Sequence, residues 1–298
     1  MGIRRVLILG DSGFMGSRLR QFFNEKSPDV EVVGRSKDSI DLTKEDQANR
    51  LAGLLDTDTA IVMCAAIKKQ LGDSLEIFSQ NLDMAINVSR LVEQHPVRRV
   101  VLFSSAEVYG EDIDGTSVTE QAPVRPTSYY GAAKHVTECL LRKAVENRRN
   151  SSLLVLRPPL VYGPGDMSRG YGPSGFIWAA LNGQEITFWG DGEELREFVY
   201  LDDLARIVHE LTFSEYDGVI NVATGRSHTF KEVLDIVARL APGELQVNSR
   251  PRTRAKIDVG FSNGLLSELS PNLEFTGLEE GIRRTLEAES RHVKEMVH

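Results

Sequence analysis

Cysteine is nearly absent from this sequence of 298 residues, which contains only Cys64 and Cys139. Two thiols cannot form the framework of several disulfides that stabilises small secreted proteins. Cys64 ends an apolar run and Cys139 falls inside a helical pattern, so we expect both to be buried, unreactive thiols. The histidines show no metal-ligand spacing with cysteine or acidic partners, and we therefore expect no metal site.

Long apolar runs and an excess of positive charge are missing as well. No run approaches the roughly 18 residues that a membrane span requires, so we expect no membrane partner. The amino terminus leads directly into a strand-like segment rather than a signal peptide, and a cytoplasmic location is the simplest expectation. The net charge of -8 disfavours nucleic acid as a partner, because phosphate backbones require a basic surface.

What the sequence does contain is an alternation of short apolar runs and helical patterns. Helical spacing of Leu82, Ala85 and Val92, and of residues 136–144, predicts crossover helices between strands. The fold class is therefore predicted as α/β, with a doubly wound parallel (Rossmann) sheet. Four runs are continuous enough to be strands buried on both faces, as parallel sheets require: Val6–Leu9, Ala60–Cys64, Val100–Phe103 and Leu153–Leu156.

A second, smaller lobe is expected after the segment Gly163–Pro173, which contains too many glycines and prolines for a regular element. Strands at Glu197–Tyr200 and Val219–Val222, with a helix from Asp202, are expected to return to the first lobe. These limits predict a dinucleotide-binding domain and a discontinuous C-terminal lobe that binds substrate. The first covers residues 1–163 and 197–224, and the second covers residues 164–196 and 225–298.

Gly10, Gly13 and Gly16 follow the first strand and open a helical segment. In that context glycines allow a tight turn and the close approach of a pyrophosphate to backbone amides. The spacing is G-x-x-G-x-x-G rather than the commoner G-x-G-x-x-G, and taken alone the triplet fits an ordinary strand-to-helix turn equally well.

The end of the second strand carries the signal for cofactor choice. Folds that prefer NAD place an acidic residue there, which binds the ribose hydroxyls, whereas this chain has Gly34 followed by Arg35 and Ser36. Arg35 and Ser36 can instead hold a 2'-phosphate, so NADP is the preferred cofactor, with NAD as the alternative. The other interpretation is that both are solvated loop residues.

Tyr130 and Lys134 lie four residues apart, which places both side chains on one face of a helix. The ammonium is then expected to lower the phenol pKa from its ordinary value of about 10. Tyr129 is excluded as an alternative, because Ala133 lies four residues after it. Ser105 ends the strand Val100–Phe103 at the carboxyl edge of the sheet, where open α/β proteins bind their ligands.

Together these motifs resemble the extended short-chain dehydrogenase/reductases of the NAD-dependent epimerase/dehydratase family, over nearly the whole chain. The segments that carry the resemblance are Gly10–Gly16, Cys64–Ala66, Ser104–Gly110, Pro126–Lys134, Leu156–Pro164, Arg196–Asp203 and Asn221–Gly225.

The resemblance implies a role for each candidate residue. Tyr130 would exchange a proton with a sugar hydroxyl or ketone, Lys134 would tune it and hold the nicotinamide ribose, and Ser105 would hydrogen-bond the same substrate oxygen. Arg196 and Arg250 would bind the diphosphate of a nucleotide sugar, although either can be a surface ion-pair partner. The cofactor would lie against Gly10, Ser12, Gly13, Phe14, Met15, Gly16, Arg35, Ser36, Leu42, Ala65, Ala66, Tyr130, Lys134 and Pro158.

Two further expectations concern surfaces of the molecule. Relatives often form homodimers through the Tyr130 helix and the helix before it, and the apolar residues Met84, Val88 and Leu91 are consistent with such a face. Lys68 and Lys69 are expected to face solvent.

The residues after Ser105 divide the possible reactions. Dehydratases of this kind carry an acid and a base there, and Ala106 can be neither, although Glu107 can still abstract a proton. We therefore expect a nucleotide-sugar 4-ketoreductase or 4-epimerase. The alternatives are a 4,6-dehydratase or decarboxylase that uses Glu107, and a non-catalytic NADP-binding scaffold or sensor.

Overall fold

The structure is a computed structural model that describes residues 2–113, 115–146, 148, 150–166, 172–253 and 255–296, with side chains described as far as residue 291. Part of the predicted loop Gly163–Pro173 therefore lies outside the described residues. The chain divides into two compact units. The first consists of Met1–Glu111, Glu120–Pro158 and Ala205–Asn221, and the second of Asp112–Thr119, Pro159–Leu204 and Val222–His298. The domain limits predicted from the sequence stay a prediction.

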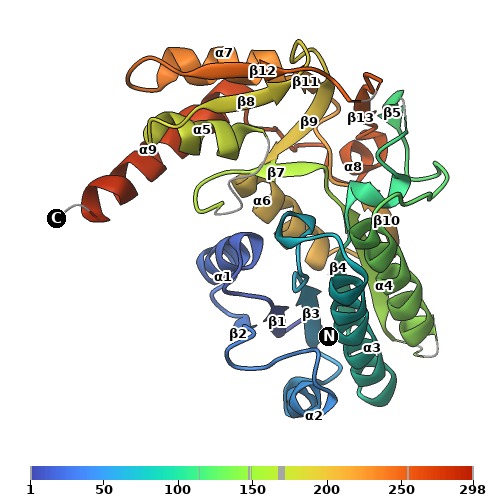
Figure 1. Cartoon of the computed structure of the whole chain (residues 1–298). Coiled ribbons are helices and arrows are strands. Elements are labelled where there is room, and N and C mark those ends of the chain that lie inside the picture. Colours follow the sequence, from blue (N-terminus) through green and yellow to red (C-terminus); the bar gives the residue numbers. More distant parts are fainter. Residues whose placement is uncertain are drawn as a thin grey trace. The chain divides into compact units, whose positions relative to one another are not determined.

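A six-stranded parallel sheet organises the first unit, with the strand order β10-β6-β4-β3-β1-β2 (Figure 1). β3 and β4 are buried along their whole length, as strands covered on both faces must be. The four predicted buried strands and the doubly wound fold class are thus confirmed. The strands are β1 (Arg5–Leu9), β2 (Glu31–Arg35), β3 (Thr59–Met63), β4 (Arg99–Phe103), β6 (Ser152–Arg157) and β10 (Gly218–Asn221).

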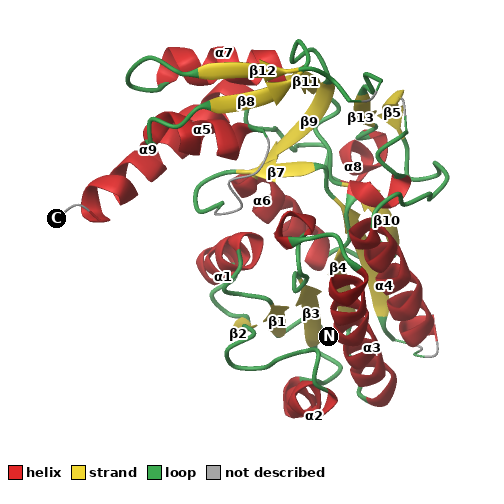
Figure 2. Ribbon diagram, in the orientation of Figure 1, coloured by secondary structure: helices red, strands yellow, loops and turns green. Residues whose placement is uncertain are grey.

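Helices cover both faces of this sheet (Figure 2). α3 (Leu75–Gln94) and α4 (Tyr129–Glu146) pack side by side on one face, while α1 (Phe14–Lys26) lies on the other. Part of α6 (Leu201–Thr212) also belongs to this unit. The remaining elements are short: α2 (Glu45–Ala48) and the 3-10 helices η1 (Asn49–Leu54), η2 (Lys69–Leu71) and η3 (Ala106–Tyr109). Because η2 and η3 follow the carboxyl ends of β3 and β4, they bring their side chains to one edge of the sheet.

The apolar faces of α3 and α4 differ from the prediction. Met84, Val88 and Leu91 are buried in the core of the first unit, so they do not form an exposed dimer face. On α4 the buried residues include Gly131, Ala133 and Leu141, whereas the expected core positions 136 and 140 are partly exposed. Small residues at 131 and 133 explain this rotation, because a Cβ atom at position 131 would lie only 2.6 Å from the carbonyl oxygen of Glu107.

The expectation that both thiols are buried is wrong for Cys139, which is exposed. It lies on the outward side of α4 that the rotated packing leaves uncovered. Cys64 is partly buried, and desolvation raises its pKa to about 12. The Cys64 thiol is therefore protonated and unreactive at neutral pH.

In its described residues, the second unit contains three small sheets. β9 lies between β7 and β11, β12 pairs with β8, and β13 pairs with β5. Its helices α5, α7 and α9 share an apolar core that includes Phe176, Phe198 and Val233. The bounds are β5 (Gly115–Val118), β7 (Leu160–Tyr162), β8 (Ile186–Trp189), β9 (Leu195–Tyr200), β11 (Ser227–Thr229), β12 (Val247–Arg250), β13 (Val259–Phe261), α5 (Pro173–Leu181), α7 (Phe230–Leu240), α8 (Gly264–Leu269) and α9 (Leu278–Met296).

The strand predicted at Glu197–Tyr200 exists as β9, but it does not join the six-stranded sheet. The buried carboxylate of Glu197 accepts hydrogen bonds from the backbone amides of Gly225 (2.8 Å) and Phe261 (2.9 Å), which tie β9 to the second unit. The strand predicted at Val219–Val222 does join the large sheet, as β10. Among the helices in the described part of the chain, none is long and apolar enough to cross a membrane.

Candidate active site

The glycine-rich turn between β1 and α1 is tightly packed against its neighbours. Gly10 has a φ of +89°, and a Cβ atom there would lie 2.9 Å from the amide nitrogen of Ala65. A Cβ atom at Gly16 would lie 2.8 Å from the carbonyl carbon of Gly10. Only glycine allows both approaches, so the turn brings the start of α1 close to the loop that follows β3.

A groove of about 220 Å³ runs along this turn. Within the described residues, no side chain caps the first turn of α1, whose N-cap is Gly13, and its backbone amides are free to bind an anion. The groove therefore fits the pyrophosphate of a dinucleotide. Its lining brings together most of the predicted cofactor residues, namely Gly10, Ser12, Gly13, Phe14, Met15, Gly16, Arg35, Ser36, Leu42, Ala65 and Ala66.

The absence of an acidic side chain at the end of β2 has a steric cause. A Cβ atom at Gly34 would lie 2.8 Å from Cβ of Asp11 and closer still to its carboxylate. Asp11 is buried and pairs with Arg20 at 2.9 Å, so it cannot easily move aside. Arg35 and Lys37 line the groove beside this point and supply positive charge where the usual carboxylate is absent.

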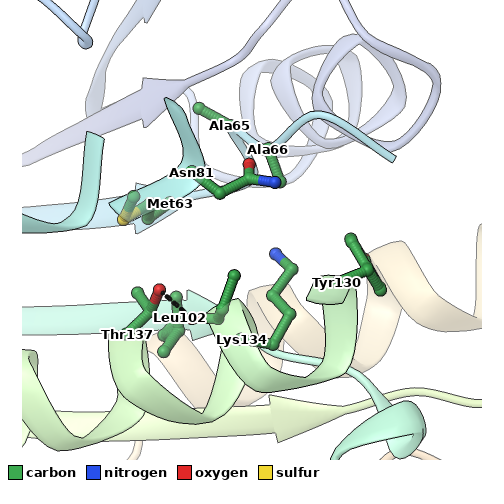
Figure 3. Close-up of a pocket in the computed structure, with 9 residues that line it drawn as sticks. Met63, Ala65, Ala66, Asn81, Leu102, Tyr130, Lys134 and Thr137 are labelled. Carbon is green, nitrogen blue, oxygen red and sulfur yellow. Dashed lines mark hydrogen bonds between the residues drawn. The ribbon is translucent and has the colours of Figure 1, made fainter. Parts of the chain in front are cut away.

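The catalytic candidates lie at the carboxyl edge of the same sheet. Tyr130 and Lys134 project from the first turns of α4 into a narrow space that Ala65 and Ala66 also line (Figure 3). Since both alanines line the cofactor groove as well, the two spaces adjoin. The Lys134 ammonium lies 5.7 Å from the centre of the Tyr130 ring, and the Ser105 side chain is close enough to the Tyr130 hydroxyl to lower its pKa. The structure therefore brings Ser105, Tyr130 and Lys134 together.

The predicted lowering of the Tyr130 pKa by Lys134 is not observed. Burial is the main cause that raises the pKa of Tyr130, the charge of Glu107 raises it further, and the nearby Ser105 side chain lowers it. Burial also lowers the pKa of Lys134 to about 8. Lys134 Nζ donates a hydrogen bond to the carbonyl oxygen of Phe103 at 2.6 Å, which directs the ammonium toward the backbone of β4.

Glu107 belongs to a charged group that the sequence did not reveal. Its Oε2 atom accepts a hydrogen bond from Ser128 Oγ at 3.0 Å and lies 3.3 Å from Lys69 Nζ. Lys69 also pairs with Glu111. The expectation that Lys68 and Lys69 face solvent is therefore wrong: the Lys68 ammonium lies 5.2 Å from the centre of the Phe14 ring and lines the cofactor groove.

Two other groups missed in the sequence support the site from behind. Arg157, at the end of β6, forms a bidentate ion pair with Glu138 of α4. Its Nε atom donates to Oε1 at 2.9 Å and its Nη2 atom donates to Oε2 at 2.6 Å, and both side chains are buried. Asn81 exchanges hydrogen bonds with the backbone of Ile67 at 2.8 and 3.1 Å, which fixes the loop after β3. Polar residues that alternate with apolar ones on a helix face were the available signal for Asn81 and Glu138.

Pro158 lies just beyond β6, where its carbonyl oxygen accepts a hydrogen bond from the amide of Ala106 at 3.0 Å. It thus anchors η3, and its contact with the cofactor stays a prediction.

The two arginines predicted to bind substrate belong to the second unit. Arg196 donates hydrogen bonds to the carbonyl oxygens of Leu195 (2.8 Å) and Ile257 (2.7 Å) and pairs with Glu194 at 3.2 Å. Arg250 is an exposed residue at the end of β12. The same group of charges includes Arg252, which pairs with Glu194 at 2.9 Å and with Asp191.

In the described residues, no group of three or more histidine, cysteine or acidic side chains is arranged to hold a metal ion.

A parallel sheet with a glycine-rich turn after its first strand, and with a Tyr-Lys pair at the carboxyl edge of the same sheet, defines a dinucleotide-binding enzyme of the short-chain dehydrogenase/reductase class. The sequence profile of the NAD dependent epimerase/dehydratase family matches residues 6–223. The chain belongs to this family, whose members are NAD(P)-dependent enzymes of the extended short-chain dehydrogenase/reductase type.

Similar proteins modify nucleotide-linked sugars. A dTDP-4-dehydro-6-deoxy-D-allose reductase from Streptomyces sp is 28% identical and covers 94% of this chain and 95% of its own. A GDP-L-fucose synthase from Dictyostelium discoideum is 24% identical, with 95% and 94% covered. Among solved structures, a UDP-glucose 4-epimerase from Thermus thermophilus in complex with NAD superposes with a TM-score of 0.82 at 26% identity, with 95% of this chain and 98% of that chain covered.

Proposed function

We propose that this protein is a nucleotide-sugar 4-ketoreductase or 4-epimerase, in which Tyr130 exchanges a proton with the oxygen on sugar C4. The observation that carries this proposal is the convergence of Ser105, Tyr130 and Lys134 beside the groove that begins at the glycine-rich turn. Bound nicotinamide supplies or accepts the hydride. Ser105 and Tyr130 present two hydroxyl groups to one substrate oxygen, where negative charge develops during transfer.

The side chains that can donate or accept a proton in this site favour hydride exchange at C4 over elimination. Ala106 is buried and has no proton to give, and the Glu107 carboxylate is engaged by Ser128 and Lys69. A dehydratase or decarboxylase would need Glu107 as a base, whereas hydride exchange at C4 needs only the hydroxyl pair. A non-catalytic scaffold would not require a Tyr-Lys pair at the end of the groove.

NADP is the cofactor that we propose. Its support is the positive charge of Arg35 and Lys37 along the groove, and the steric exclusion of an acidic side chain from position 34 by Asp11. A 2'-phosphate binds well to guanidinium groups, whereas free ribose hydroxyls usually require a carboxylate at this position.

The substrate diphosphate is proposed to bind Arg196 and Arg250, with Arg252 added on structural grounds because it shares Glu194 with Arg196.

We also propose a homodimer. Its support is the uncovered outer side of α4, where Cys139 is exposed and Val136 and Leu140 are partly exposed.

Incubation of the purified protein with a panel of nucleotide sugars and 4-keto nucleotide sugars, each with NADPH and with NADH, tests the function. Net oxidation of NADPH by a 4-keto sugar identifies a reductase, and inversion at C4 without net cofactor turnover identifies an epimerase. Loss of water or carbon dioxide from a nucleotide sugar would instead identify the Glu107-dependent reactions. Binding of the cofactor without turnover of any sugar would support a scaffold or sensor.

A further inference from the structure

The Glu107 carboxylate is held from two sides at the edge of the active site. Ser128 Oγ donates a hydrogen bond to its Oε2 atom at 3.0 Å, and Lys69 Nζ approaches the same atom at 3.3 Å. The Lys69 and Glu107 side chains are only 27% and 31% exposed. Charges in such a half-buried position interact more strongly than an exposed surface pair does.

Ser128, one of the two residues that hold Glu107, also lies beside Tyr130. The backbone amide of Glu107 donates a hydrogen bond to Ser105 Oγ at 3.2 Å, and the Ser105 side chain is close enough to the Tyr130 hydroxyl to lower its pKa. On the other side, Ser128 Oγ accepts a hydrogen bond from the backbone amide of Gly131, the residue after Tyr130. The carboxylate therefore lies near the phenol, and its negative charge opposes phenol ionisation.

We propose that Lys69 is a positioning residue for proton transfer at Tyr130: it holds the Glu107 carboxylate against Ser128 and offsets its charge beside the phenol. This inference rests on the proposed function, because it assigns to η2 a part in the same proton exchange. It explains why a lysine in the loop after β3 is paired with two carboxylates rather than directed into solvent. Without the ammonium, the negative charge of Glu107 would act on the phenol without the compensating positive charge of Lys69.

Other charged or titratable groups surround the Glu107 carboxylate and Tyr130, and each of them stays unchanged in the variants described below. Any difference between variants therefore reports on Lys69 and Glu107. These groups are Asp73, whose carboxylate accepts a hydrogen bond from the Tyr130 amide, Glu111, which pairs with Lys69, and Lys134, which in turn interacts with Cys64 and Glu138.

Direct titration of the Tyr130 phenol tests the proposal. The holoenzyme, saturated with oxidised nicotinamide dinucleotide and labelled with ¹³C at Cζ of tyrosine, is followed by NMR from pH 6 upward, and the Tyr130 resonance is assigned by its loss in Tyr130→Phe. Lys69→Met should raise the midpoint by on the order of one pH unit, and Glu107→Gln should lower it by a similar amount. In the double variant the midpoint should stay near that of Glu107→Gln.

Two controls separate this effect from a structural one. Lys69→Arg keeps the charge and should titrate close to the wild type. Lys143→Met removes an exposed lysine from α4, whose pair with Glu146 has the same 3.3 Å length, and it should leave the Tyr130 midpoint in place. Equal midpoints in wild type and Lys69→Met, or shifts of the same sign in both single variants, would overturn the proposal. Because the titration needs no sugar, inactivity toward nucleotide sugars alongside the expected shifts would count against the proposed function alone.

Discussion

The pKa values of Tyr130 and Lys134 are shifted in opposite directions by the same physical cause. Burial favours the neutral form of each group, so it raises the pKa of the phenol and lowers that of the ammonium to about 8. At neutral pH, Tyr130 is therefore a protonated hydroxyl, and Lys134 is still mostly charged. A protonated phenol beside Ser105 is ready to donate to a ketone oxygen, which is the reductive direction of the proposed reaction.

Removal of the Tyr130 hydroxyl should abolish turnover without loss of cofactor binding. We expect Tyr130→Phe to lower kcat by at least about 100-fold, the usual contribution of a positioned acid or base. Steady-state kinetics and a cofactor binding titration measure the two effects. Tyr129→Phe is the matched control, since Tyr129 is an exposed neighbour on the same helix turn and should keep wild-type activity. Equal losses in the two variants would show that Tyr130 has no special role.

Arg35 should decide between the two dinucleotides. Because hydrogen bonds to a charged group contribute about 1.5–3 kcal/mol, Arg35→Ala should raise the Kd for NADPH by roughly tenfold or more. The Kd for NADH should change little. Calorimetric titration with both cofactors measures this, and Arg90→Ala, which removes an exposed arginine paired with Glu45, serves as the control. A parallel loss for NADPH and NADH would argue against a 2'-phosphate contact.

At the scale of elements, the Glu138–Arg157 pair joins α4 to β6 behind the active site. The guanidinium also lies 4.9 Å from the centre of the Tyr109 ring and donates to its hydroxyl at 3.1 Å. The Tyr109 hydroxyl donates to Asn221 at 2.7 Å, so one buried network links α4, η3, β6 and β10. Such a network fixes the helix that carries Tyr130.

Breaking this pair from one side should be costly, because it leaves a buried charge without its partner. Glu138→Gln is expected to lower the free energy of unfolding by about 3 kcal/mol. Glu146→Gln, which breaks an exposed pair on the same helix, is expected to cost less than about 1 kcal/mol. Urea denaturation of the two variants measures the difference, and similar values for both would contradict a special role of the buried pair.

α1 and α6 meet through His209, whose Nε2 atom lies 2.8 Å from Ser27 Oγ among the rings of Phe22, Phe23 and Phe213. Burial lowers the pKa of His209 below its ordinary value of 6.5. The unfolded chain therefore binds this proton at a higher pH than the folded chain does. The stabilisation is complete above pH 6.5 and is lost as the pH falls from there toward the lowered pKa.

The pH dependence of stability should show this effect. Between pH 7.5 and 5.5 the free energy of unfolding of the wild type should fall more steeply than that of His209→Gln, in which the titrating group is removed. Urea denaturation at several pH values provides the comparison. Parallel curves would show that His209 does not contribute to acid sensitivity.

How far the sequence predicts these elements depends on whether a signal is local. The buried strands, the glycine-rich turn and the Tyr130–Lys134 spacing are encoded in adjacent residues, and the structure contains each of them. The outward rotation of α4, the pairing of β9 with β7 and β11, and the attachment of Lys69 to Glu107 depend on contacts between residues far apart in the chain. Local periodicity cannot reveal such contacts, because several apolar or charged residues satisfy the pattern equally well.

For the molecule as a whole, the uncovered side of α4 bears on the proposed homodimer. Sedimentation velocity of the wild type should give the mass of two chains. Val136→Glu places a charge on this side of the helix and should shift the protein toward a single chain, because burial of an unpaired carboxylate is unfavourable. Arg239→Gln, which removes an exposed arginine from α7, should leave the dimer intact. A wild type that sediments as one chain would exclude the dimer.

The most direct measurement of the whole molecule's function follows the transferred hydride itself. NADPH that carries deuterium on the transferable position of nicotinamide C4 is incubated with the protein and the 4-keto nucleotide sugars of the panel, and the sugars are examined by NMR. We predict deuterium at sugar C4 with a single configuration in the wild type, and none in Tyr130→Phe. Deuterium at C4 in both proteins, or none in either while the cofactor binds normally, would contradict hydride exchange governed by Tyr130.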